Sequence, residues 1–134
     1  EMTLEEIIEK LYVAVKKGKK VVRLHSGDPA YYSAIAEQIC RLKKLGIEYE
    51  VIPGVTSASA AAAVIGQELT IPEVSQTVIF TRFKGKTPVP DTENLSELAK
   101  HRSTMVIFLS IAMVEKVMNA LLVEYPEDTP VVVV

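Results

Sequence analysis

The sequence predicts an α/β fold with mostly parallel sheets covered by helices. Short apolar stretches alternate with amphipathic helical patterns along the whole 134 residues. The stretch at 104–109 is apolar almost throughout rather than at every second position, which is typical of a parallel strand buried on both faces. Gly and Pro separate the elements. These observations favour strands joined by right-handed helical crossovers.

The first half of the chain is predicted to be a helix followed by two strand-loop-helix units. Thr3 and Glu6 are spaced as a capping box that begins a helix, and Gly18 gives the stop signal that ends it. The elements then expected are a strand at 20–24, a helix from Tyr31 to Gly46, a strand at 47–52 and an alanine-rich helix at 57–65.

The second half continues the alternation. The expected elements are a strand at 76–82, an extended loop at 84–92, a helix at 94–101, a strand at 104–109, a helix at 114–122 and a strand at 131–134. Pro72 interrupts any regular element between the halves. We therefore predict an N-terminal subdomain at 1–73 and the first part of a C-terminal subdomain at 74–134.

Composition narrows the class of protein. Fifteen Lys and Arg against 17 Asp and Glu give a net charge of −2, which provides no overall field for holding nucleic acid or an anionic membrane. No apolar run approaches the roughly 20 residues that span a bilayer. The single cysteine, Cys40, forms no internal disulfide and cannot make a zinc site alone. We expect a cytoplasmic protein without nucleic-acid or membrane partners and without a protein-bound metal.

Three loops at the expected carboxyl ends of strands are candidate ligand sites: 26–29, 53–57 and 109–112. Gly27 permits close approach to the backbone, and Asp28 accepts hydrogen bonds. Asp28 has an equally weighted alternative, which is to cap a helix that Pro29 opens. Thr56 and Ser57 likewise either cap the next helix or offer a hydroxyl to a ligand.

A basic cluster follows the strand at 76–82. Arg82, Lys84 and Lys86 could bind carboxylates beside a site, although a solvated charged loop is the alternative. The dinucleotide fingerprint, the Walker A loop and the G-x-S-x-G and H-E-x-x-H motifs are missing from the sequence. Taken alone, the residues predict an α/β ligand-binding or enzymatic domain with three candidate loops.

Three blocks resemble the tetrapyrrole methylase family in their order and spacing. They are VVRLHSGDP at 21–29, VIPGVTS at 51–57 and TMVIFLS at 104–110. The family carries an (S/T/G)-G-D-P loop after one strand and a P-G-(V/I)-(T/S)-(S/A) loop after a later one. Residues 73–90 resemble the branch that methylates C11 of precorrin-4 or cobalt-precorrin-4 in corrin (vitamin B12) biosynthesis. The match covers the middle of a family member, so the chain is expected to be incomplete at both ends and to lack full activity alone.

The resemblance implies a two-domain enzyme, a homodimer when intact, that transfers a methyl group from S-adenosyl-L-methionine to a tetrapyrrole. The donor-binding residues that it implies are Ser26, Gly27, Asp28, Tyr31, Thr56, Ser57 and Leu109. Arg82, Lys84 and Lys86 would hold the carboxylates of the macrocycle, and no residue is assigned as a catalytic base. The alternatives are a methyltransferase for uroporphyrinogen or another precorrin, and a non-catalytic α/β ligand-binding module.

Overall fold

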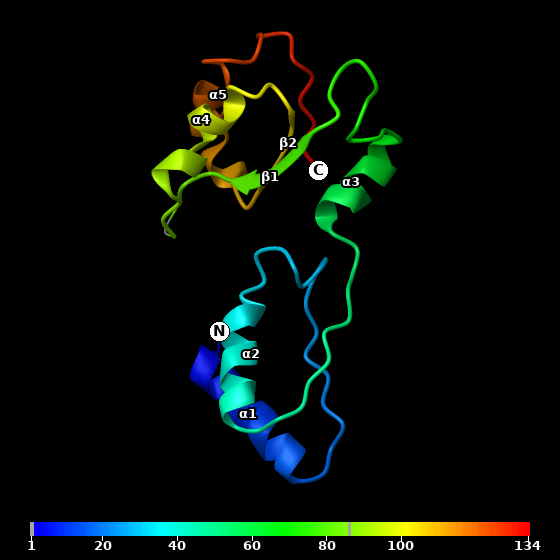
Figure 1. The fold of residues 1–134 in the computed structure, drawn as a ribbon, viewed down its shortest axis with the longest axis vertical. Helices are drawn as coiled ribbons and strands as arrows, with labels where there is room; N and C mark the ends of the chain where they lie inside the picture. The colour runs from blue at the N-terminus through cyan, green and yellow to red at the C-terminus, as the bar shows by residue number, and fades with distance from the viewer. Residues whose placement is uncertain (1, 86) are drawn as a thin grey trace. The chain divides into compact units, whose positions relative to one another are not determined.

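The computed structural model describes residues 2–85 and 87–134. The chain divides into two compact units, Glu1–Ala60 and Ala61–Val134, which are described separately. The helices and strands are α1 (Leu4–Lys16), α2 (Ile35–Lys44), α3 (Ser57–Ile65), β1 (Val78–Arg82), α4 (Leu95–Ala99), β2 (Thr104–Phe108) and α5 (Val114–Leu121), with 3₁₀ turns η1 (Asp91–Glu93) and η2 (Ile111–Met113) (Figure 1). The α/β class is confirmed. The subdomain boundary after residue 73 stays a prediction.

Helix α1 begins where the sequence predicts. The backbone N–H of Thr3 donates to the Glu6 carboxylate at 2.7 Å, and the N–H of Glu6 donates to the Thr3 hydroxyl at 3.2 Å. The hydrogen bond from the Thr3 backbone holds the pKa of the Glu6 carboxyl below its usual value. Helix α1 packs against α2, with Ile8 and Gln38 buried in the N-terminal unit.

Helix α2 begins at Ile35, later than the predicted start at Tyr31. Residues 29–33 form turns and bends, and both Tyr32 and Ala34 have a left-handed backbone, with φ of 53° and 51°. A left-handed residue breaks the helical backbone, so the apolar pattern here does not correspond to a continuous helix.

Three predicted strands lack strand pairing in the described structure. Residues 20–24, 47–52 and 131–134 have no assigned ladder. A strand requires hydrogen bonds to a neighbouring backbone, and an apolar run by itself does not supply that neighbour. The side chains of Leu24 and Ile52 are accordingly exposed, at 79% and 72%.

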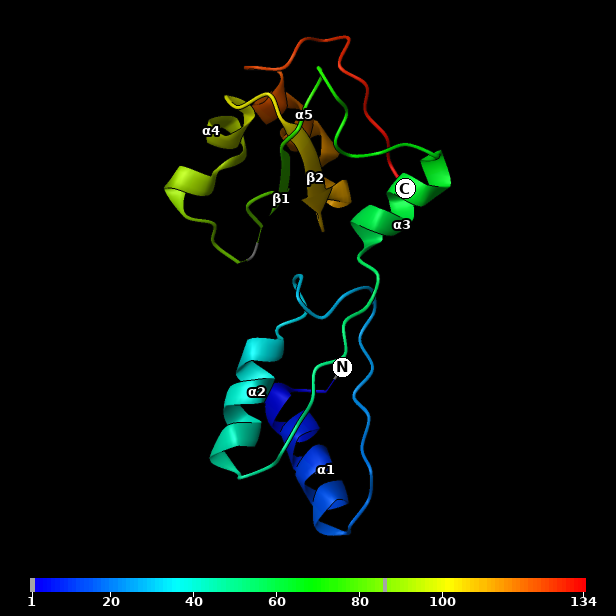
Figure 2. The same cartoon turned by 45° about the vertical axis from the view of Figure 1, so that its right-hand side comes forward.

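The C-terminal unit is built around a parallel pair of strands. Strand β1 pairs with β2 in a register that runs from Val78 opposite Thr104 to Arg82 opposite Phe108. Phe80 and Phe108 meet edge to face, with ring centroids 5.6 Å apart. Because the strands are parallel, the loops that follow Arg82 and Phe108 emerge at the same end of the sheet (Figure 2).

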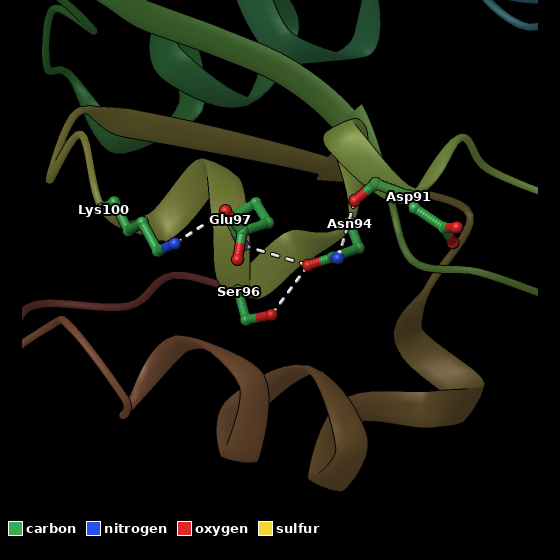
Figure 3. A network of polar contacts seen from close by, with 5 residues as sticks. All are labelled: Asp91, Asn94, Ser96, Glu97 and Lys100. Carbon is green, nitrogen blue, oxygen red and sulfur yellow. Dashed lines mark hydrogen bonds and ion pairs between the residues drawn. The ribbon is translucent and has the colours of Figure 1, made fainter.

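The crossover between the strands contains α4, whose start is fixed by Asn94 (Figure 3). The Asn94 side-chain oxygen accepts from the Glu97 N–H at 3.0 Å and from the Ser96 hydroxyl at 2.7 Å. Its amide donates to the Asp91 carbonyl at 2.7 Å. This network caps α4 and ends the long loop that follows β1.

Helix α4 packs against α5, and the buried apolar residues of this unit lie on these helices. Leu95, Ala99 and Val117 are at most 8% exposed. The Tyr125 hydroxyl donates to the carbonyl of Ser103, immediately before β2, and partial burial raises the pKa of Tyr125. These contacts hold the start of β2, at the end of the sheet opposite the two loops.

Candidate functional site

The structure brings the first two candidate loops together within the N-terminal unit. The N–H of Gly54 donates to the Asp28 carboxylate at 3.3 Å, across 26 positions of sequence. The backbones also meet directly, since a Cβ atom built on Gly54 would lie 2.1 Å from the carbonyl oxygen of Gly27. Only glycine fits at residue 54 in this arrangement. We call the contact between 26–29 and 53–57 the loop junction.

Asp28 connects the two loops instead of capping a helix. One carboxylate oxygen accepts from the N–H of Ala30 at 2.8 Å, and the other accepts from Gly54. The alternative in which Pro29 opens a helix is wrong, because α2 begins at Ile35. The side chain thereby fixes both its own turn and the neighbouring loop.

Ser26 and Gly27 form the exposed bend of the junction. Gly27 has φ of +66°, a conformation that side-chain-bearing residues rarely adopt. A Cβ atom there would lie 3.7 Å from the carbonyl oxygen of Val55 and 3.8 Å from the nitrogen of Ser57. The backbone of the first loop therefore lies directly against that of the second.

Tyr31 lies on the turn after Asp28, and its backbone N–H donates to the Asp28 carbonyl at 3.2 Å. Its side chain is 42% exposed. The left-handed residue Tyr32 follows at once. Tyr31 is thus held close to the junction by a turn and not by the helix on which the sequence places it.

Thr56 and Ser57 stand at the start of α3. The Thr56 hydroxyl accepts from the N–H of Ala58 at 3.4 Å, and its carbonyl accepts from Ala60 at 3.0 Å. These bonds support the capping alternative for Thr56, although the first is long. Ser57 is exposed beside the Gly27 turn.

The third candidate loop lies in the C-terminal unit. Leu109 directly follows β2, has φ of +54° and exposes 74% of its surface. A left-handed leucine is sterically disfavoured and requires its surroundings to hold it. The turn directs a large apolar side chain outward at the carboxyl end of the sheet.

Sequence reasoning missed Ser110. This residue is 4% exposed, and its hydroxyl accepts from the N–H of Phe83 at 2.9 Å and donates to the Phe108 carbonyl at 2.6 Å. The available signal was a hydroxyl residue immediately beyond an apolar strand, where ladder pairing stops and backbone groups need new partners.

The structure gives the basic residues different surroundings. The Arg82 guanidinium donates from one nitrogen to the carbonyls of Thr87 and Pro88, at 3.4 and 3.2 Å. Lys84 is exposed. Lys86 lies outside the described residues. Arg82 therefore closes the loop 83–88, and Lys84 stands on that loop.

The described part of the chain contains neither a metal-binding cluster of side chains nor a membrane-spanning helix. Across 2–85 and 87–134, no three His, Cys, Asp or Glu side chains gather as a group able to hold a metal ion. Within the same ranges, no helix is long and apolar enough to cross a membrane.

Comparison with known proteins identifies the family. The model for tetrapyrrole (corrin/porphyrin) methylases matches residues 1–134, so the chain belongs to this family. A cobalt-precorrin-4 C(11)-methyltransferase from Methanocaldococcus jannaschii is 58% identical over 134 residues, covering 99% of this chain and 52% of the relative. A precorrin-4 C(11)-methyltransferase from Pseudomonas aeruginosa is 50% identical over 134 residues, covering 100% and 54%. The chain thus spans about half the length of the curated relatives it matches.

Solved structures support the same family. A cobalt-precorrin-4 methyltransferase of cobalamin biosynthesis matches with a TM-score of 0.88 and 50% identity, covering 92% of this chain and 52% of that one. A uroporphyrin-III C-methyltransferase from Thermus thermophilus, complexed with S-adenyl homocysteine, matches with a TM-score of 0.71 and 26% identity, covering 92% and 53%. Both the fold class and the family resemblance predicted from sequence are confirmed.

Proposed function

We propose that this chain forms part of an S-adenosyl-L-methionine-dependent methyltransferase that acts on C11 of precorrin-4 or cobalt-precorrin-4 in corrin biosynthesis. The observation that carries the proposal is the loop junction, in which Asp28 holds Gly54 at 3.3 Å. Both loops are motifs of the family, and relatives 50–58% identical to the chain are named for this reaction.

The donor site is proposed to include Ser26, Gly27, Asp28, Tyr31, Thr56, Ser57 and Leu109. The first six belong to the loop junction and its flanking turns, where exposed backbone at Gly27 leaves room for a ligand to approach. The Thermus thermophilus relative that was solved with S-adenyl homocysteine supports a sulfonium donor for this family. Leu109 is proposed as an apolar contact from the C-terminal unit.

When bound, the donor supplies an electrophilic methyl group on a positively charged sulfur. The bond that forms joins this methyl to C11 through an electron pair of the macrocycle. The methyl–sulfur bond breaks, its electron pair remains on the now neutral sulfur, and the positive charge passes to the macrocycle. Such an in-line displacement depends on alignment more than on a strong base. The chain's contribution is to orient the donor with the loop junction and the macrocycle with cationic groups, and we assign no catalytic base.

The macrocycle's carboxylates are proposed to bind at Arg82, Lys84 and Lys86. Lys84 offers an exposed point charge. Arg82 uses one guanidinium nitrogen for loop carbonyls, and the fork has further N–H donors. We also propose that the complete enzyme is a homodimer, as the family resemblance implies, and that it is cytoplasmic, in accord with the single cysteine.

The function is tested in a full-length chimera, in which this chain replaces the matching segment of the Methanocaldococcus jannaschii relative. We expect methyl transfer from S-adenosyl-L-methionine to precorrin-4, in its metal-free or its cobalt form, with the new methyl at C11. Product identity by mass spectrometry and NMR checks this. Methylation of uroporphyrinogen instead would favour the rival methyltransferase, and donor binding without any transfer would favour a binding module.

Replacing Arg82 with Ala in the chimera is expected to lower kcat/KM for the tetrapyrrole. The lost transition-state stabilisation should be about 1–3 kcal/mol, the range for a lost charge-assisted contact. Donor affinity should hardly change. Arg102→Ala is the matched control, because Arg102 precedes β2 at the other end of the sheet and its ion pair with Glu124 is 4.0 Å long. Steady-state kinetics and calorimetry measure both quantities. Equal kinetics for the two variants would contradict an anchoring role for Arg82.

Lys84→Ala is expected to have a smaller effect that disappears as salt is added, because exposed charges are screened over about 10 Å at 0.1 M ionic strength. The same kinetic assay, repeated at several salt concentrations, measures this. A solvated-loop role predicts no change in tetrapyrrole KM at any salt concentration.

A further inference from the structure

A single buried hydroxyl joins the two loops at the carboxyl end of the β1–β2 sheet. Strand pairing ends at Arg82 opposite Phe108. One residue beyond β1, the N–H of Phe83 donates to the Ser110 hydroxyl at 2.9 Å, so this side chain extends the connection between the strands past the ladder. Phe83 is also the first residue of the loop that carries Lys84.

The same hydroxyl closes the turn around Leu109. Its proton is donated to the Phe108 carbonyl at 2.6 Å, across the left-handed Leu109. The hydroxyl thus uses its one donor and one of its two acceptor lone pairs on different loops, and an aliphatic side chain could serve neither partner. Because Ser110 is only 4% exposed, water has little access to replace these bonds when the hydroxyl is removed.

The two loops carry different parts of the proposed reaction. Leu109 is proposed to contact the methyl donor, and the loop that begins at Phe83 is proposed to contact the tetrapyrrole. A hydroxyl that bonds to both strand ends fixes the spacing between these loops. Arg82 fixes the far end of the loop 83–88 through the carbonyls of Thr87 and Pro88.

We propose that Ser110 is a positioning residue that couples the donor-contacting turn at Leu109 to the substrate loop at 83–88. This inference rests on the proposed function. Ser110 touches neither ligand; it acts by holding the backbone of Phe83 and the carbonyl of Phe108 in fixed register. Its loss should therefore weaken the binding of both ligands together.

The kinetic test compares Ser110→Ala with Ser110→Thr in the full-length chimera. For Ser110→Ala we expect the tetrapyrrole KM to rise about tenfold and the donor Kd about threefold, with kcat within roughly twofold, as for lost ground-state positioning. Ser110→Thr keeps the hydroxyl and should restore both constants to within about twofold. Unchanged binding constants in Ser110→Ala, or no recovery with Thr, would overturn the coupling.

Ser103→Ala is the matched control. Ser103 is similarly buried, at 7%, and stands before the other end of β2, where its hydroxyl makes only a 3.5 Å contact with the His101 carbonyl. Ser103→Ala should lower the free energy of unfolding by no more than Ser110→Ala does. It should leave the tetrapyrrole KM and the donor Kd unchanged. If Ser103→Ala shifts them equally, the Ser110 effect is one of general stability and the proposal fails.

A second measurement does not depend on activity. Amide hydrogen exchange of Phe83 in the 134-residue chain should become about tenfold faster in Ser110→Ala and stay slow in Ser110→Thr, since only the former loses the acceptor. Unchanged exchange would overturn the proposed contact. An unsubstituted chimera that methylates no tetrapyrrole would instead contradict the proposed function, and the exchange result would still decide whether Ser110 joins the loops.

Discussion

Replacing Gly54 with Ala is expected to break the loop junction. The added Cβ would lie 2.1 Å from the Gly27 carbonyl oxygen, 3.1 Å from its carbon and 3.4 Å from the Asp28 Cα, all of them backbone atoms. Backbone atoms cannot rotate away as the end of a long side chain can, so one loop must move. The movement separates the Gly54 N–H from the Asp28 carboxylate and removes that hydrogen bond as well.

We expect Gly54→Ala to weaken donor binding in the chimera by about 100-fold, which corresponds to about 2.7 kcal/mol. Overpacking should also lower the free energy of unfolding by about 3 kcal/mol, at the upper end of the usual range. Isothermal titration calorimetry and urea denaturation measure the two effects. Donor affinity within threefold of the unsubstituted chimera would mean that the junction lies outside the donor site.

Gly85→Ala is the matched control for this substitution. Like Gly54, Gly85 has no left-handed backbone, and a Cβ there meets only the Met113 methyl group at 3.7 Å, an ordinary contact. The same chemical change should therefore leave donor affinity and stability almost unaltered. A comparable loss in Gly85→Ala would show that any added methyl group disturbs this protein.

The local parts of the fold could be predicted from sequence because their causes are local. The capping box of Thr3 and Glu6 involves residues three positions apart, and α1 begins as expected. The start of α2 could not be predicted in this way. Tyr32 and Ala34 adopt left-handed conformations that neither residue type favours, so the tertiary structure overrides an apolar pattern that predicts helix.

The candidate site could be predicted as a set of loops but not as a set of contacts. The rule that ligands bind at the carboxyl ends of strands selects 26–29 and 53–57 as candidate loops, and the structure brings these two loops into contact. The rule does not reveal that Asp28 bonds to Gly54, because that bond depends on how two distant segments pack. For the same reason, the sequence identifies Arg82 as a cation but not the loop carbonyls that it contacts.

Gly27→Val is expected to abolish detectable donor binding, with a loss of at least about 100-fold. Gly27 has φ of +66°, and its backbone lies against Val55 and Ser57. The Cβ itself would fit, at 3.7 Å from the Val55 carbonyl oxygen, but the two branching methyl groups would enter the space through which a ligand approaches the loop. The left-handed backbone adds a cost to folding of about 1–2 kcal/mol.

Gly46→Val separates these two causes. Gly46 has nearly the same backbone, with φ of +65°, but nothing lies within 4 Å of a Cβ built there. Both variants should therefore lose similar stability in urea denaturation, whereas only Gly27→Val should lose donor affinity by calorimetry. Matching affinities in the two variants would attribute any effect to backbone strain alone, and an unchanged affinity in Gly27→Val would remove residues 26–29 from the donor site.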